Sequence, residues 1–138
     1  MRTPLPGVPA AITPETATFW AAGNRGELTV EECPGCGLHV FPPRGVCRRC
    51  YRRDLRLRPI SGPGTVYSHT VNHNAWGPDA PAVYTVVLVE FPGYSGVRFV
   101  GLFDDPAGPP RIGDQVGFTL VPAFDERFQI SFHRWSAS

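Results

Sequence analysis

The sequence predicts a mainly β protein in which a short N-terminal helix and a compact cysteine-rich module precede a five-stranded barrel of the OB type. Three observations support this prediction. The 138-residue chain contains 16 prolines and 15 glycines, which disfavour long helices and favour short strands joined by turns. All four cysteines lie between residues 33 and 50. Strand-like segments separated by turn sequences follow this window, and their number, five, is that of a small OB barrel.

The N-terminal part of the chain predicts a leader and then a short helix. Residues 1–12 include "PLPGVPA", a run that favours extended backbone and is typical of a linker. The chain is therefore either a free subunit or a domain of a longer protein. Residues 13–26 predict the helix, because Thr13 can cap its start and Gly23 or Gly26 can end it.

The cysteines predict a metal site within residues 27–60. They form two C-x-x-C pairs, and each pair presents two sulfurs from a tight turn. Two such turns facing each other across a hairpin place four sulfurs around one zinc ion at about 2.3 Å. Gly37 permits a left-handed turn that directs backbone amides at a thiolate, whereas the second turn, "CRRCY", has no equivalent glycine. We therefore expect a rubredoxin-like ribbon with one structural zinc ion per chain, whose ligands are Cys33, Cys36, Cys47 and Cys50.

Two other uses of the four cysteines stay open on the sequence alone. An iron centre of the rubredoxin type has the same set of four thiolate ligands. A redox-active dithiol pair would need a βαβ context, which this sequence does not predict. The spacing, the count and a predicted intracellular location, where thiols stay reduced, favour zinc.

Residues 61–138 predict the barrel, which follows a hinge-like "SGPG" joint. The segment Ala82–Phe91 is apolar on both faces, although a barrel strand has only one face inside. We expect its outer face to be covered by the N-terminal segment, by the cysteine module or by another protein. The five predicted strands are Thr65–His73, Ala82–Phe91, Gly96–Phe103, Gln115–Pro122 and Phe128–Trp135.

The 13 basic residues are all arginines, and they are unevenly distributed. Residues 1–60 carry nine arginines against five acidic residues, whereas residues 61–138 carry four against seven. Seven arginines fall within residues 44–58. They can balance the thiolate charge, contact a CoA phosphate or an acidic partner, or follow a nucleic-acid backbone. The acidic barrel argues against nucleic acid, because a single-strand groove needs basic residues interleaved with exposed aromatic residues.

The sequence indicates a cytoplasmic protein without a membrane partner. No stretch approaches the ~18 consecutive apolar residues of a membrane span. The proline-rich N-terminus lacks the continuous apolar run of a secretory signal.

The sequence predicts no catalytic residue, and hence a chain that is not an enzyme on its own. Its four histidines are accompanied by neither a serine or cysteine nucleophile nor a paired carboxylate motif. His69 and His73 share a strand face, where ordinary packing and a substrate or partner contact are both open. Aromatic residues of the helix can pack on the chain's own core or on a partner, and the loop "HNAWGPDAP" offers another such residue. The candidate partner or substrate contacts are Phe19, Trp20, His73 and Trp76.

These features together closely resemble the zinc-ribbon plus OB-fold family first called domain of unknown function 35. The resemblance covers roughly residues 14–135. It is carried by the cysteine window with its Pro-Pro-Arg sequence at residues 42–44 and by the Gly-x-Gly-Thr-Val joint from Gly62 to Val66. The matching stretches read "CPGCGLHVFPPRGVCRRC", "SGPGTVYSHTV", "PAVYTVVLVEF", "GVRFVGLF" and "RIGDQVGF".

The resemblance implies an accessory role. Such proteins are similar to small subunits that bind thiolase-fold enzymes acting on acyl-CoA, namely thiolases, hydroxymethylglutaryl-CoA synthases and lipid-transfer-type aldolases of sterol side-chain degradation. Some are fused behind a hydratase domain of the MaoC type. The resemblance implies a non-catalytic subunit of a heterotetramer, which stabilises its partner and helps to form an acyl-CoA channel, with CoA held mainly by the partner. Only the four cysteines carry over residue by residue, and a nucleic-acid-binding zinc-ribbon/OB-fold protein stays the alternative.

Overall fold

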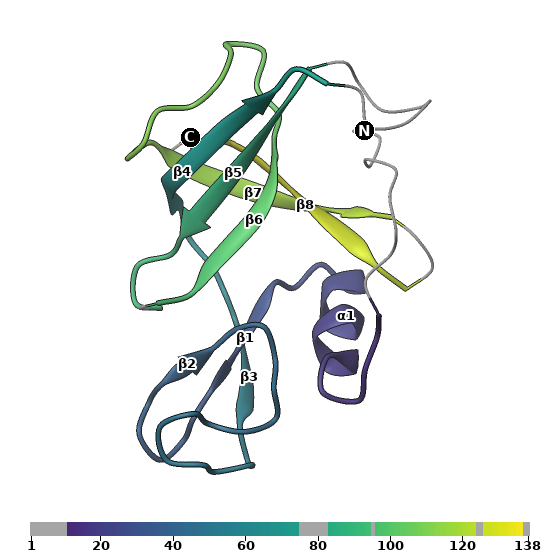
Figure 1. The fold of residues 1–138 in the computed structure, drawn as a ribbon, viewed down its shortest axis with the longest axis vertical. Coiled ribbons are helices and arrows are strands. Elements are labelled where there is room, and N and C mark those ends of the chain that lie inside the picture. Colours follow the sequence, from purple (N-terminus) through teal and green to yellow (C-terminus); the bar gives the residue numbers. More distant parts are fainter. Residues whose placement is uncertain (1–10, 75–82, 95, 124–125, 137–138) are drawn as a thin grey trace.

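The computed structural model describes residues 11–74, 83–94, 96–123 and 126–136, and it confirms the predicted fold class (Figure 1). One short helix precedes a three-stranded ribbon sheet of order β2-β1-β3 and a closed barrel of order β4-β5-β6-β8-β7. Each predicted strand boundary lies within two residues of the observed one. The elements are α1 (Ala17–Asn24), β1 (Thr29–Glu32), β2 (His39–Val40), β3 (Arg56–Pro59), β4 (Gly64–Asn72), β5 (Tyr84–Glu90), β6 (Arg98–Phe103), β7 (Gln115–Pro122) and β8 (Phe128–Arg134).

The helix α1 begins later than the sequence predicts. A turn precedes it, in which the backbone N–H groups of Thr16 and Ala17 both donate to the carbonyl of Thr13. Helical structure therefore starts at Ala17, and Thr16 occupies the capping position without a capping side-chain hydrogen bond. The helix ends at Asn24, two residues before Gly26, which is one of the two glycines expected to end it. Gly26 has a φ of 88°, and its N–H donates to the carbonyl of Gly23.

The barrel closes through a short parallel contact between β6 and β8. The other barrel neighbours pair antiparallel, and β4 changes register between Val66 and Ser68. Gly101 lies where β6 approaches β8, and a Cβ atom there would stand 2.5 Å from the carbonyl oxygen of Ile130. The absence of a side chain at Gly101 therefore allows the two strands to close the barrel.

The helix, the ribbon and the barrel share one hydrophobic core. Phe19 of α1 and Val30 of β1 are buried in the same cluster as the barrel residues Phe99 and Phe132. Figure 1 shows α1 and the ribbon side by side at one end of the barrel. The packing fixes the ribbon on the barrel, so that the metal site and the barrel surface form parts of one rigid shape.

The outer face of β5 is apolar, as the sequence predicts. Val87 and Val89 point into the core, whereas Val86 and Leu88 on the opposite face are half-buried. Leu88 pairs with Val100 of β6, whose side chain is 62% exposed. The described residues thus cover this face only in part.

Within the part of the chain that the structure describes, no helix has the length and apolarity needed to cross a membrane.

Candidate metal centre and adjoining groove

The four cysteines converge on one point at the end of the ribbon. Their sulfur atoms all lie within 4.8 Å of one another. The Sγ atoms of Cys33 and Cys50 are 3.4 Å apart, and those of Cys36 and Cys47 are 3.6 Å apart. A tetrahedral site with zinc–sulfur bonds of 2.3 Å requires sulfur–sulfur distances of about 3.8 Å, so this donor set fits one zinc ion.

Two turns of the same construction present these sulfurs. In the first, Cys33 N–H donates to the carbonyl of Leu38, and Gly37 N–H donates to the carbonyl of Cys33. The second repeats this pattern, with Cys47 N–H donating to the carbonyl of Arg52 and Tyr51 N–H to that of Cys47.

The left-handed position of each turn is occupied by a different kind of residue. Gly37 has a φ of 77°, as the sequence predicts. Tyr51 takes the equivalent place with a φ of 64°, although it carries a bulky side chain. The second turn therefore forms without a glycine at its left-handed position.

Backbone amides prepare the sulfurs for a cation. The N–H groups of Cys50 and Arg49 lower the pKa of the Cys47 thiol to about 6, against the opposing effect of burial. The N–H groups of Cys36 and Gly35 act in the same way on Cys33, whose pKa is also lowered.

The fourth sulfur shows why a cation is needed. A backbone N–H of Arg52 lowers the pKa of Cys50, but hydrogen bonds with the sulfurs of Cys33 and Cys47 and the loss of solvent raise it to about 11. Four adjacent thiolates repel one another, and a divalent metal ion removes this penalty. The site is thus suited to hold Zn²⁺ through four thiolates in a closed shell, which is a structural role.

Residues next to the metal site contact either its turns or the barrel. Arg52 passes over the first turn, where a Cβ atom on Gly35 would lie 2.8 Å from its Cδ, and it donates two hydrogen bonds to Asp54 at 2.9 and 2.6 Å. His39 bonds to Glu32 at 3.1 Å and packs edge-on against Tyr94 of the β5–β6 loop, with ring centroids 4.9 Å apart. His39 therefore joins the ribbon to the barrel, outside the sulfur cluster.

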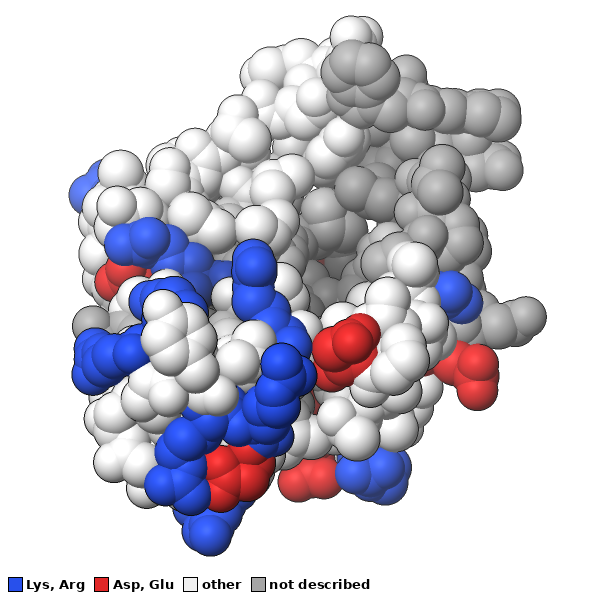
Figure 2. Space-filling model, turned by 60° about the horizontal axis from the view of Figure 1, so that its bottom comes forward, with Lys and Arg blue, Asp and Glu red and all other residues white. Residues whose placement is uncertain are grey.

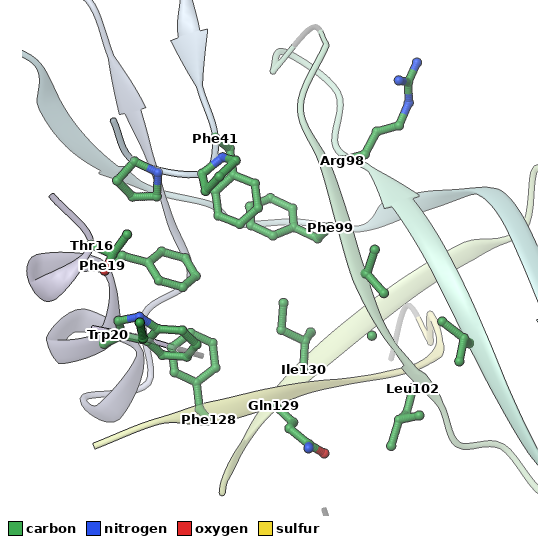
Figure 3. Close-up of a pocket in the computed structure, with 16 residues that line it drawn as sticks. Thr16, Phe19, Trp20, Phe41, Arg98, Phe99, Leu102, Phe128, Gln129 and Ile130 are labelled. Carbon is green, nitrogen blue, oxygen red and sulfur yellow. The ribbon is translucent and has the colours of Figure 1, made fainter. Parts of the chain in front are cut away.

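A second feature, an apolar groove of about 580 Å³, lies between α1, the segment after β2 and the β6–β8 side of the barrel (Figure 3). Aromatic rings form one wall: Phe41 packs against Phe99 at an interplanar angle of 45° with ring centroids 4.3 Å apart, and the centroids of Trp20 and Phe128 are 5.1 Å apart. Arg98 stands at the opposite side. The sequence did not reveal this groove, because its walls come from segments about 20, 40, 100 and 130 residues along the chain. The residues lining it are Ala11, Thr16, Phe19, Trp20, Phe41, Pro42, Pro43, Val86, Arg98, Phe99, Val100, Gly101, Leu102, Phe128, Gln129 and Ile130.

The predicted contact residues fall in different places. Phe19 is a core residue at 7% exposure whose ring also lines the groove, and Trp20 is half-buried beside it. His73 is exposed just after β4, far from the cysteines in sequence. Trp76 lies outside the described residues. His69 has a buried Nδ1 atom without a hydrogen-bond partner among the described residues.

Comparison with known families matches both halves of the chain. Residues 20–56 match the rubredoxin-like zinc ribbon domain of ChsH2, and residues 57–120 match the C-terminal OB-fold domain of ChsH2. The chain belongs to the ChsH2/DUF35 family. The family resemblance stated from the sequence is confirmed, and the four cysteines fall within the match to the ribbon domain.

Individual relatives of this ChsH2/DUF35 chain differ in how much they cover. A DUF35 domain-containing scaffold protein of Methanocaldococcus jannaschii is 32% identical over 77 residues, so the match spans about half of this chain and half of the relative, at 53% and 52%. The solved structure of an "Ltp2-ChsH2(DUF35) aldolase" contains a chain that is 27% identical, with a TM-score of 0.78 over 91% of this chain and 98% of that one. A DUF35 protein of unknown function from Sulfolobus solfataricus, at 17% identity and a TM-score of 0.66 over 88% and 86%, shares the fold.

Proposed function

We propose that this chain is a non-catalytic accessory subunit of a thiolase-fold enzyme that acts on an acyl-CoA, with zinc as a structural element of the ribbon. The observation that carries the proposal is the near-complete match to a chain in an Ltp2-ChsH2 aldolase, over 91% of this chain and 98% of that one. A match of that extent leaves little of this chain for a separate catalytic domain. The scaffold description of the archaeal relative supports the same role.

The chemistry of the described residues agrees with an accessory role. The four cysteines are the single group of three or more histidine, cysteine or acidic residues that converge in the described part of the chain. With four thiolates bound, a zinc ion has no open position for a substrate or for water. The metal would therefore stabilise the ribbon and take no part in the acyl-CoA reaction.

The surface suited to a partner is the apolar groove together with the outer face of β5 and β6. Val86 and the exposed Val100 belong to both, and the half-buried Leu88, which pairs with Val100, extends the apolar strip beyond the groove. An exposed apolar surface of this kind marks an interface more often than a free face. Here we propose that the partner subunit packs against the groove and that its acyl-CoA channel is partly formed by this wall.

Affinity purification from the organism of origin, followed by mass spectrometry, tests the proposal. A thiolase-fold protein should co-purify, and co-expression of the two should yield one complex by sizing, with activity that the isolated chain lacks. Trp20→Ala, which removes a half-buried ring that lines the groove, should weaken that complex and leave one zinc ion per chain.

Separate elution of the two proteins, with a fully active enzyme alone, would contradict the proposal. Recovery of RNA or ribosomal components in place of an enzyme would instead favour a nucleic-acid role. Loss of zinc in Trp20→Ala would show that this residue supports the ribbon rather than a partner.

A further inference from the structure

Tyr51 occupies a backbone position that disfavours a bulky residue, and most of its surface is exposed to solvent. Its φ of 64° lies in the left-handed region, where a bulky side chain is strained. The equivalent place in the first turn is filled by Gly37, so the turn itself does not require a tyrosine. With 76% of its surface exposed, Tyr51 is the most exposed large hydrophobic residue of the described chain. Residues held in such strained backbone conformations cluster at functional sites.

Arginines surround this tyrosine in excess of what the metal site needs. Residues 44–58 contain seven arginines and one acidic residue, and a zinc ion with four thiolates contributes about −2, which leaves a net formal charge of about +4. Two of the seven are engaged within the chain, Arg52 with Asp54 and Arg58 with Glu32. Figure 2 shows basic side chains gathered over the ribbon end of the molecule, with few acidic ones among them.

The remaining arginines of this stretch project into solvent. All are exposed, and within the described residues none of them takes part in a recorded ion pair. We call Tyr51 and these neighbours the arginine face; its other members are Arg44, Arg48, Arg49, Arg53 and Arg56.

We propose that the arginine face is a docking surface for a protein partner that presents aspartate and glutamate carboxylates around a pocket for Tyr51. Arginine binds carboxylates through two parallel hydrogen bonds, and tyrosine and arginine are the residues most enriched where interface energy is concentrated. The face lies on the ribbon and none of its members lines the apolar groove, so it provides a second surface beyond that of the proposed function.

Protein carboxylates fit this face better than nucleic acid does. A single-strand site needs several aromatic side chains in series along a basic path, and the arginine face has one. The barrel region, residues 61–138, carries four arginines against seven acidic residues. Its net negative charge would repel a long nucleic acid that extended from the ribbon onto the barrel. A compact acidic protein surface, unlike a long nucleic acid, can contact the ribbon alone and avoid the acidic barrel.

Photo-crosslinking from position 51 tests the proposal in the organism of origin. The residue is replaced by p-benzoyl-phenylalanine in the full chain, and the crosslinked product is identified by mass spectrometry. We expect a protein, crosslinked at a segment with aspartate or glutamate within a few residues. Arg49→Glu with Arg53→Glu should reduce the yield about tenfold, whereas Arg111→Glu on the barrel, an equal change in charge per site, should leave it within about twofold.

Two further results would overturn the proposal. One is a crosslink to nucleic acid or to a segment without acidic residues. The other is a yield at position 51 no greater than that from the same reagent at Ile112, which is 70% exposed on the barrel.

Tyr51→Gly provides a measurement on the chain itself. Since glycine suits the left-handed position, the variant should keep its zinc and melt at the same or a higher temperature, yet bind the crosslinked protein about thirtyfold more weakly. A lower melting temperature would mean that Tyr51 serves the fold, and the proposal would fail. A thiolase-fold protein at the crosslink would support the proposed function too, whereas another acidic protein would support this inference alone.

Discussion

Replacing Gly23 with alanine provides a sharp test of how α1 packs on the barrel. Helix propensity alone predicts that this change stabilises the protein by about 1 kcal/mol, because glycine is a poor helix former. The structure predicts the opposite sign. A Cβ atom on Gly23 would lie 1.8 Å from Cε1 of the Phe128 ring and 2.5 Å from Cζ.

The ring cannot move aside without further cost. Phe128 is 7% exposed, and its ring centroid lies 5.3 Å from that of Phe19 and 5.1 Å from that of Trp20. Overpacking of a core costs about 1–3 kcal/mol. A Cβ atom only 1.8 Å from the ring places Gly23→Ala in the upper part of that range, at about 2–3 kcal/mol. After the gain of about 1 kcal/mol in helix propensity is subtracted, we expect Gly23→Ala to lower the free energy of unfolding by about 1–2 kcal/mol, which corresponds to roughly 3–10 °C in melting temperature.

Urea and thermal unfolding of the zinc-loaded chain measure this effect, with two variants as controls. Ala21→Gly, at an exposed site of the same helix, reports the propensity contribution alone and should cost about 1 kcal/mol. Phe128→Leu removes the clashing ring, so the double variant should show a coupling free energy of about 2 kcal/mol. If Gly23→Ala stabilises the chain and does not couple to Phe128→Leu, then the close packing of α1 on β8 is wrong.

Further predictions concern the metal site, the first turn and the barrel. Elemental analysis should find one zinc ion per chain, and Cys36→Ser should lose it and unfold the ribbon; a metal-free wild type or an iron spectrum would contradict this. Gly37→Ala should lower the free energy of unfolding in urea by about 1–2 kcal/mol and retain zinc. The cost is backbone strain alone, because Gly37 has a φ of 77° and no atom lies within 4 Å of the added Cβ. The pKa of Asp105 is lowered by the N–H of Ala107 and by Arg134, so its carboxylate stabilises the fold above the unfolded pKa of about 3.9, and this contribution is lost as the pH falls through the folded value. The urea midpoints of wild type and Asp105→Asn should therefore differ at pH 7 and converge below about pH 4, and a constant difference would contradict the assignment.

Much of the metal site could be predicted from the sequence because its information is local. Two C-x-x-C pairs in one short window specify both the donor atoms and the turns that present them. The barrel strands were equally accessible, since alternation of apolar residues and the proline- and glycine-rich turns mark each strand within its own segment. The start of α1 was harder to predict from the sequence. Thr13 has a side chain suited to a helix cap, yet it begins a turn that precedes the helix.

The groove and the arginine face were decided by tertiary structure. The groove exists because Phe41 of the ribbon, Trp20 of α1 and Phe128 of β8 meet at one place, and no periodicity in the sequence relates segments so far apart. The arginine run was visible in the sequence, but its excess over the metal charge depended on which arginines find an acidic partner in space. Tyr51 shows the same division: the sequence indicated a missing glycine, and only the fold revealed that an exposed tyrosine takes the left-handed conformation in its place. Local patterns determine turns and strands through backbone sterics, whereas surfaces depend on which distant side chains remain uncovered once the core has formed.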